Sequence, residues 1–206
     1  MRAARKISHE TYMSKQSSIL DPTQIQSILN HPQVIEHLGK LAPNTRSLTQ
    51  PTQPTQSQVY FTLELSDSIK SALAEGLGLD LRGVKQVPLR WIVGDTATHA
   101  DVGVKRFSNT HLVYLSDSEG EFLLNGVPHA IRAGQGFVFN EGVLHGTTGT
   151  GGVPRLLLGP MNEVGQAVGA PVVYYATESD ALTYTDNIGV SAIIHSPRSL
   201  VFRVGA

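Results

Sequence analysis

The chain has 206 residues, 40% of them hydrophobic, with 16 Lys and Arg against 17 Asp and Glu. This length can bury one substantial core. The formal net charge is −1, and the sequence has no stripe of clustered Lys and Arg with which proteins neutralise nucleic-acid phosphates. No run of residues approaches the roughly eighteen apolar residues of a membrane span, and the residues after the charged start are too polar for a secretion signal. We therefore expect a soluble, intracellular protein that binds neither nucleic acid nor membrane.

Residues 1–58 are predicted to form a helical N-terminal extension and a spacer. Two short helices are expected within residues 18–42, because Asp21-Pro22 and His31-Pro32 each place a proline at the first helical position, where its missing N–H is not needed. The Thr/Gln/Pro-rich residues 43–58 cannot build a core and indicate an extended spacer. A boundary is therefore placed after residue 58.

Residues 59–170 are predicted to form the main domain. A strand over 59–65, a helix over 66–79 and a strand over 87–93 come first, and the pattern then changes to short strands separated by turns. Asn125-Gly126 indicates a tight hairpin, because both residues tolerate the positive φ of a type I′ turn. The later strands are predicted over residues 111–115, 121–124, 127–132, 137–139, 143–145 and 154–158.

Short strands at this spacing predict a mainly β protein, a double-stranded β-helix (a cupin-like jelly roll) with N-terminal helices. Residues 171–206 contain three more candidate strands. These either extend a sheet or mediate assembly, for example as a homodimer formed through the terminal segments, and the sequence leaves both readings open.

His99, Asp101 and His145 are the candidate metal ligands. Residues i and i+2 of an extended segment point the same way, so His99 and Asp101 can reach one ion together. A jelly roll can bring the distant His145 to them. The chain has no cysteine, so a metal here must use imidazole and carboxylate ligands. Two histidines and one carboxylate with open positions are typical of non-haem Fe(II).

Arg155 lies ten residues after His145. If residues 143–145 and 154–158 are neighbouring antiparallel strands joined by the glycine-rich loop 146–152, Arg155 lies across from the metal site. Its planar guanidinium binds carboxylates through two parallel hydrogen bonds. The alternative is a structural ion pair with Glu141 or Glu163.

The order H-x-D, distal His and Arg ten positions later resembles the Fe(II)/2-oxoglutarate-dependent dioxygenase superfamily, whose fold is the double-stranded β-helix. Residues 99–158 are most similar to its aspartyl/asparaginyl β-hydroxylase-like branch, through Thr110-His111-Leu112 and the glycine turn before Phe137. That branch often lacks the carboxylate ligand that Asp101 supplies here.

The resemblance implies a hydroxylase that holds Fe(II) on His99, Asp101 and His145, with 2-oxoglutarate as its co-substrate. It implies that Arg155 binds the far carboxylate of 2-oxoglutarate, and that the positions of His111 and Asn109 help to hold this co-substrate. Asn109 is neutral where the branch often has an arginine. The products would be succinate, CO2 and a hydroxylated protein side chain or small molecule.

Two other functions remain open at this point. One is a metal-dependent cupin-type enzyme that does not use 2-oxoglutarate, with Arg155 binding another anion. The other is a non-catalytic jelly-roll protein for binding or structure, in which the histidines are packing residues.

Overall fold

The computed structural model describes side chains over residues 18–41, 57–101 and 108–168, and backbone strands at 13–16, 172–175, 191–196 and 199–203. The predicted spacer lies outside the described residues except for Ser57 and Gln58, which begin a strand. The division of the chain after residue 58 and after residue 170 stays a prediction.

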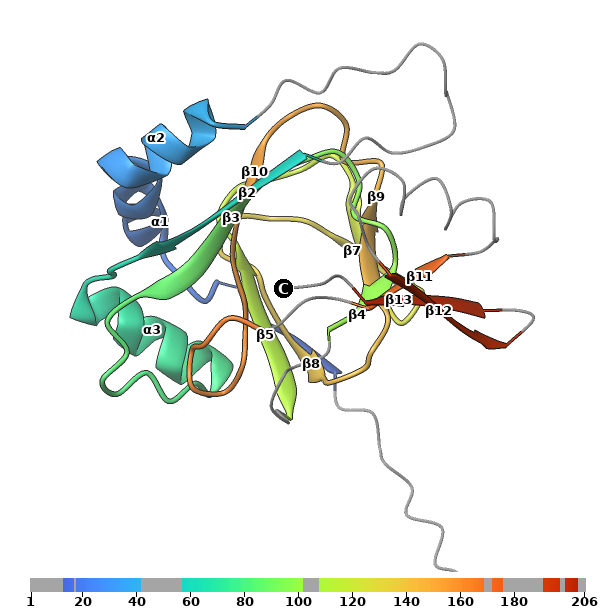
Figure 1. Ribbon diagram of the computed structural model, residues 1–206. Helices are drawn as coiled ribbons and strands as arrows, with labels where there is room; N and C mark the ends of the chain where they lie inside the picture. Colours follow the sequence, from blue (N-terminus) through green and yellow to red (C-terminus); the bar gives the residue numbers. More distant parts are fainter. Residues whose placement is uncertain are drawn as a thin grey trace, which may run out of the picture.

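Two antiparallel sheets form the body of the protein (Figure 1). The first sheet has the order β1-β8-β5-β10-β3-β2, and the second has the order β12-β13-β11-β4-β9-β6-β7. The first contains β1 (Met13–Gln16), β2 (Ser57–Leu63), β3 (Val87–Val93), β5 (Asn109–Tyr114), β8 (Gly136–Asn140) and β10 (Arg155–Met161). The second contains β4 (His99–Ala100), β6 (Glu121–Leu124), β7 (Val127–Ala130), β9 (His145–Thr148), β11 (Val172–Tyr175), β12 (Ser191–Ser196) and β13 (Ser199–Arg203).

From β3 to β10 the chain passes repeatedly between the two sheets, with β3, β5, β8 and β10 in the first and β4, β6, β7 and β9 in the second. This is the winding of a double-stranded β-helix, so the predicted fold class is confirmed. In the C-terminal segment β11 pairs with β4, and β13 pairs with β11 and β12. These strands therefore extend the second sheet, and a role in assembly stays a prediction.

The predicted helices form because their first turns are capped. The Asp21 carboxylate accepts the backbone N–H of Gln24 at 2.8 Å, and His31 Nδ1 accepts that of Gln33 at 3.2 Å. None of the helices in the described ranges is long and apolar enough to cross a membrane. Within the described residues the helices are α1 (Pro22–Leu29), α2 (Pro32–Gly39) and α3 (Asp67–Leu77).

Alternate residues of the first sheet pack into two different hydrophobic clusters. Leu89 and Trp91 of β3 join the cluster shared with the helices, and the Trp91 indole N–H donates to the Val34 carbonyl at 2.9 Å. Ile92 joins the second cluster, which contains Phe122 of the other sheet and so lies between the sheets. We call the side of the first sheet that faces the second its inner face. The helices cover the opposite side (Figure 1).

The turn prediction at Asn125-Gly126 is confirmed, with φ values of 50° and 78°. The prediction of a strand over residues 143–145 is wrong, because Gly142, with φ of 82°, turns the chain and the strand begins at His145. Residues 146–148, predicted as loop, instead pair with β6.

The prediction that this strand lies beside residues 154–158 is also wrong. The edges of β9 pair with β4 and β6, whereas those of β10 pair with β3 and β5, so the two strands belong to different sheets. The connection between them crosses from one sheet to the other.

Candidate metal centre

His99, Asp101 and His145 converge between the two sheets. His99 on β4 is paired directly with His145, the first residue of β9, and Asp101 follows β4 two residues after His99. One potential ligand atom from each residue lies within 4.8 Å of the others. The Asp101 oxygens are 3.7 Å from His99 Nε2 and 3.5 Å from His145 Nε2. The three predicted ligands are therefore brought together, each at most 4% exposed.

Backbone carbonyls hold both imidazoles. His99 Nδ1 lies 2.8 Å from the Ala97 carbonyl and His145 Nδ1 lies 3.0 Å from the Val143 carbonyl, so each Nδ1–H donates and each Nε2 keeps its lone pair. Burial lowers the pKa of both histidines; that of His99 falls to about 4, with the neighbouring His145 adding to the effect and Asp101 opposing it. Neutral imidazoles with free Nε2 atoms are ready to bind a metal ion.

The polar atoms of this site fit a divalent metal ion. His145 Nε2 is buried and has no hydrogen-bond partner, which is costly for a polar atom unless something else binds it. The Thr110 hydroxyl donates to Asp101 Oδ2 at 3.1 Å, which holds the carboxylate in position. Two imidazoles and one carboxylate on one side of an ion match the donor set of non-haem Fe(II) sites.

The loop before His99 is fastened to the segment after β9. The Asp95 carboxylate accepts the backbone N–H groups of Gly149 and Thr150 at 3.0 and 2.8 Å. The Thr147 hydroxyl accepts the Thr96 N–H at 2.8 Å. These contacts hold the two histidine-bearing segments side by side, whereas the hydrogen-bond partners of the histidines themselves are backbone carbonyls.

Arg155 extends from the first sheet toward the strand that carries His145. It is 1% exposed, and it shares the inner face with Leu157, which is part of the cluster between the sheets. Its Nη1 donates to the Gly94 carbonyl at 2.8 Å, and its Nη2 donates to the Thr147 hydroxyl at 3.0 Å. Thr147 lies two residues after His145 on β9.

Arg155 therefore contacts the strand that carries His145, although it does so from the other sheet and not from a neighbouring strand as predicted. No described carboxylate forms an ion pair with it, neither Glu141 nor Glu163. Its Nε is buried without a hydrogen-bond partner. A buried guanidinium with an unused donor is suited to bind an anion.

His111 and Asn109 are not brought to this centre. Thr110 contacts Asp101, and Leu112 and Tyr114 belong to the cluster between the sheets. Because strand side chains alternate, His111 and Asn109 belong to the other face of β5. Asn109 accepts there from the Asn140 side-chain amide at 3.3 Å. Their proposed contact with 2-oxoglutarate has no support from this arrangement.

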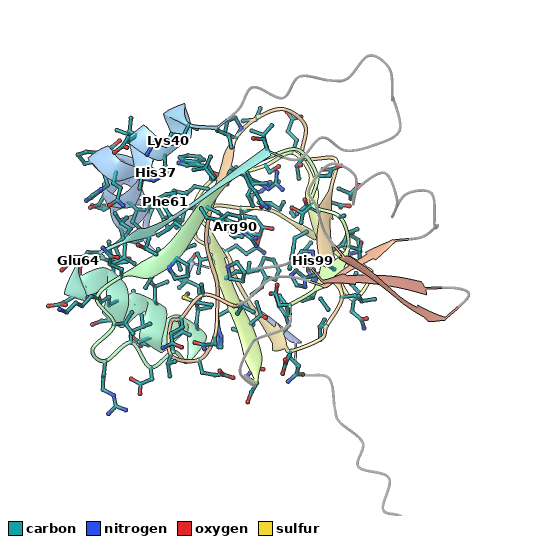
Figure 2. The ribbon with its side chains drawn as sticks, viewed as in Figure 1. His37, Lys40, Phe61, Glu64, Arg90 and His99 are labelled. Atoms are coloured by element: carbon teal, nitrogen blue, oxygen red, sulfur yellow. The ribbon has the colours of Figure 1, made fainter. Side chains whose placement is uncertain are left out.

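Sequence reasoning missed Tyr114 and Arg90, which both share the inner face with Arg155. Burial raises the pKa of Tyr114 to about 12 against the opposing charges of Arg155 and Arg90, so its hydroxyl keeps its proton and can donate. Arg90, on β3 between Leu89 and Trp91, is 7% exposed. Figure 2 shows Arg90 on the first sheet and His99 across the interior from it. In the sequence, Arg90 and Tyr114 alternate along their strands with residues that pack against the helices. This alternation identifies them as interior residues only when it is known which face of the sheet the helices cover.

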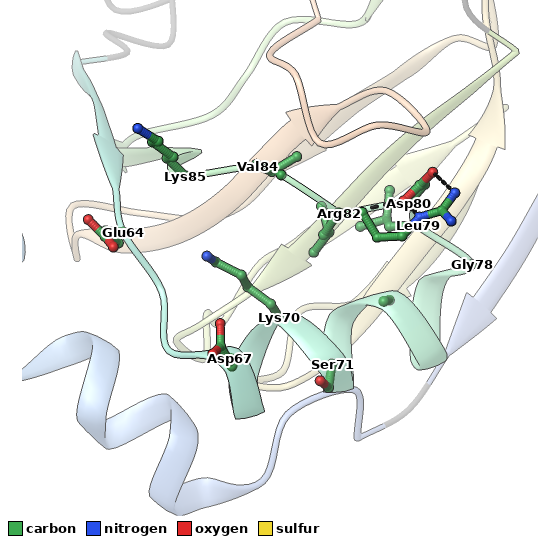
Figure 3. Close-up of a pocket in the computed structure, with 13 residues that line it drawn as sticks. Glu64, Asp67, Lys70, Ser71, Gly78, Leu79, Asp80, Arg82, Val84 and Lys85 are labelled. Carbon is green, nitrogen blue, oxygen red and sulfur yellow. Dashed lines mark hydrogen bonds and ion pairs between the residues drawn. The ribbon is translucent and has the colours of Figure 1, made fainter.

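An open groove lies elsewhere, between α3 and residues 78–85 (Figure 3). Its Arg82 is exposed and paired with Asp80 at 2.7 Å. This groove includes none of the three candidate ligands.

No family model matches the sequence, and no curated protein matches it. Solved structures that match include a Pseudomonas putida prolyl-4-hydroxylase, with 19% identity, 72% of this chain and 91% of that chain covered, and a TM-score of 0.45. A viral collagen prolyl hydroxylase from Paramecium bursaria chlorella virus-1, in complex with 2OG, has 12% identity, coverage of 74% and 96%, and a TM-score of 0.42.

The non-haem α-ketoglutarate-dependent epimerase SnoN from nogalamycin biosynthesis has 13% identity, coverage of 78% of each chain, and a TM-score of 0.46. Likenesses at this level do not assign a reaction to this chain. Its chemistry has to be inferred from its own side chains.

Proposed function

We propose that this protein is an Fe(II)- and 2-oxoglutarate-dependent oxygenase that hydroxylates a small molecule or a protein side chain. The observation that carries the proposal is the pairing of a buried His99, Asp101 and His145 centre with Arg155, a buried arginine whose Nε is unpartnered and which contacts the same strand, β9. A metal centre alone fits many cupin-type enzymes. The arginine favours a co-substrate with a second carboxylate.

In this proposal His99 Nε2, His145 Nε2 and one Asp101 oxygen hold the Fe(II), which when bound supplies the activation of oxygen for oxidative decarboxylation of 2-oxoglutarate. A donor set of two imidazoles and one carboxylate would leave open positions for the co-substrate. The Ala97 and Val143 carbonyls keep the imidazole rings oriented.

Arg155 and Tyr114 bind the far carboxylate of 2-oxoglutarate. The unused Arg155 Nε–H and the protonated Tyr114 hydroxyl are donors, and the two side chains are close enough for each to shift the pKa of the other. The burial of both strengthens a charge-assisted hydrogen bond, because water does not compete for it. In this proposal the co-substrate lies between this pair and the metal.

The test is to incubate the purified protein with Fe(II), ascorbate and 2-oxoglutarate, and to measure succinate formed without added substrate. Substrate-free decarboxylation needs the metal, the co-substrate and O2 from air as the oxidant, and ascorbate returns the iron to Fe(II) over many turnovers. Succinate that depends on both Fe(II) and 2-oxoglutarate, and that is lost in Asp101→Ala, supports the proposal. Absence of succinate together with absence of 2-oxoglutarate binding favours a cupin-type enzyme or a structural protein.

A further inference from the structure

Arg90 is a buried cation that the proposed function leaves unused. It is 7% exposed, and no described carboxylate forms an ion pair with it. Its one hydrogen bond to a described residue is a long one, from Nη1 to the Tyr60 hydroxyl at 3.3 Å. Its guanidinium carbon also lies 5.7 Å from the centre of the Tyr60 ring. Tyr60, on the edge strand β2, is 56% exposed, whereas Arg90 is buried. The Arg90 and Tyr60 pair therefore extends from the protein surface at the edge of the sheet into the interior.

The unused edge of Arg90 is the one formed by Nε and Nη2. The Nε atom is buried and has no partner, and Nη2 makes no hydrogen bond to a described residue. These two N–H groups are parallel and coplanar, and their spacing matches the two oxygens of a carboxylate. A buried positive charge without an anion is unfavourable, so a bound anion is the natural partner for it.

Arg90 is placed to act on a molecule that reaches the metal centre. It shares the inner face of β3 with Ile92, and it pairs across the strands with Leu157, which lies two residues from Arg155. The two arginines are therefore separate: Arg155 is fastened to Gly94 and β9, and Arg90 is fastened to β2.

We propose that Arg90, supported by Tyr60, binds a carboxylate of the substrate, so that the oxygenase acts on an acid. This proposal rests on the proposed function and names its substrate class. The carboxylate belongs either to a small organic acid or to an acidic side chain in a peptide, because the same fork recognises both. Tyr60 orients the guanidinium from the rim, and the Nε and Nη2 edge receives the anion.

The test uses protein loaded with Mn(II) and saturated with N-oxalylglycine, a 2-oxoglutarate analogue that does not turn over. Binding of N-oxalylglycine is measured first, by calorimetry, in the wild type, Arg90→Met and Arg90→Lys. We expect similar affinities in all three, which also shows that the variants fold. No binding to the wild type would refute the proposed function itself. A loss of more than tenfold confined to the Arg90 variants would place Arg90 at the co-substrate and overturn this inference.

Acetate is then titrated into the same complexes and followed by NMR, with acetamide as the neutral probe. We expect saturable acetate binding to the wild type, at least tenfold weaker binding to Arg90→Met, partial recovery in Arg90→Lys, and no binding of acetamide. Arg82→Met, which removes an exposed arginine from the groove of Figure 3, is the matched control and should bind acetate as the wild type does.

The source of the carboxylate is tested with glutarate, as a small acid, and with a short peptide containing one glutamate and capped at both ends. Tighter binding of either one through Arg90 identifies the source and supports the inference. Acetate binding that is absent in the wild type, or that is equal in Arg90→Met, overturns it.

Discussion

Replacing Arg155 by methionine should selectively weaken the binding of 2-oxoglutarate. Methionine keeps much of the apolar stem and removes the guanidinium. Each hydrogen bond to a charged group contributes about 1.5–3 kcal/mol. Arg155 offers one free donor, Nε–H, so loss of the proposed contact to the far carboxylate should cost about 1.5–3 kcal/mol, while the Tyr114 hydroxyl remains to bind it. That is a loss of affinity on the order of 10- to 150-fold.

The same substitution removes the bond from Nη1 to the Gly94 carbonyl at 2.8 Å and the bond to the Thr147 hydroxyl at 3.0 Å. We therefore also expect the free energy of unfolding to fall by about 1–3 kcal/mol, the usual cost of leaving a buried polar group unpaired. Arg155→Lys keeps a positive charge but lacks the planar guanidinium. Its affinity for 2-oxoglutarate should therefore lie between those of the wild type and Arg155→Met.

The assay is calorimetric titration of 2-oxoglutarate into Mn(II)-loaded protein without turnover, with metal binding measured separately in each variant. Denaturant unfolding provides the fold control. A change in 2-oxoglutarate affinity below threefold, in a folded Arg155→Met variant that still binds metal, would refute the role of Arg155.

Four other substitutions or conditions test the remaining structure. Asp101→Ala should lose Mn(II) affinity by at least a hundredfold while keeping its fold, and equal metal binding would exclude the triad. Tyr114→Phe should weaken 2-oxoglutarate binding about tenfold, the value of roughly one hydrogen bond, and unchanged affinity would remove Tyr114 from the site. Gly146→Ala should lower the free energy of unfolding by about 1–3 kcal/mol, because its Cβ would lie 2.9 Å from the Thr96 carbonyl oxygen, whereas Gly152→Ala, with no heavy atom within 4 Å, is the control. The free energy of unfolding of the metal-free protein should fall as the pH drops from about 6.5 toward 4. The reason is that the pKa of His99 is lowered to about 4 in the folded protein, so the unfolded chain takes up the proton first. A His99→Asn variant should show a shallower fall.

Local signals in the sequence predicted most of the elements. Asp21 and His31 cap their helices as expected, and Asn125-Gly126 makes the tight turn, because these residues determine their backbone through contacts a few positions away. The i and i+2 spacing of His99 and Asp101 also needed only strand geometry. Convergence with His145 required the jelly roll, which the strand spacing predicted.

Relations between distant strands were not predictable in the same way. The position of Arg155 was inferred from a pairing of β9 with β10 that the structure does not have, and the residue still contacts β9 because its long side chain crosses between the sheets to Thr147. His111 was assigned to the site from a resemblance, whereas strand alternation beside Thr110 puts it on the opposite face. Tyr114 and Arg90 were missed because their faces depend on which strands and helices pack against them.

The most direct test of the oxygenase proposal is turnover under ¹⁸O2 with Fe(II), ascorbate and 2-oxoglutarate, followed by mass spectrometry of the succinate. Oxidative decarboxylation cleaves the bond between the first and second carbons of 2-oxoglutarate, releases CO2, and places one oxygen atom from O2 in the new carboxylate of succinate. We expect succinate with one ¹⁸O atom from the wild type and none from Asp101→Ala. Unlabelled succinate, or none from wild-type protein that binds metal and 2-oxoglutarate, would contradict the proposal.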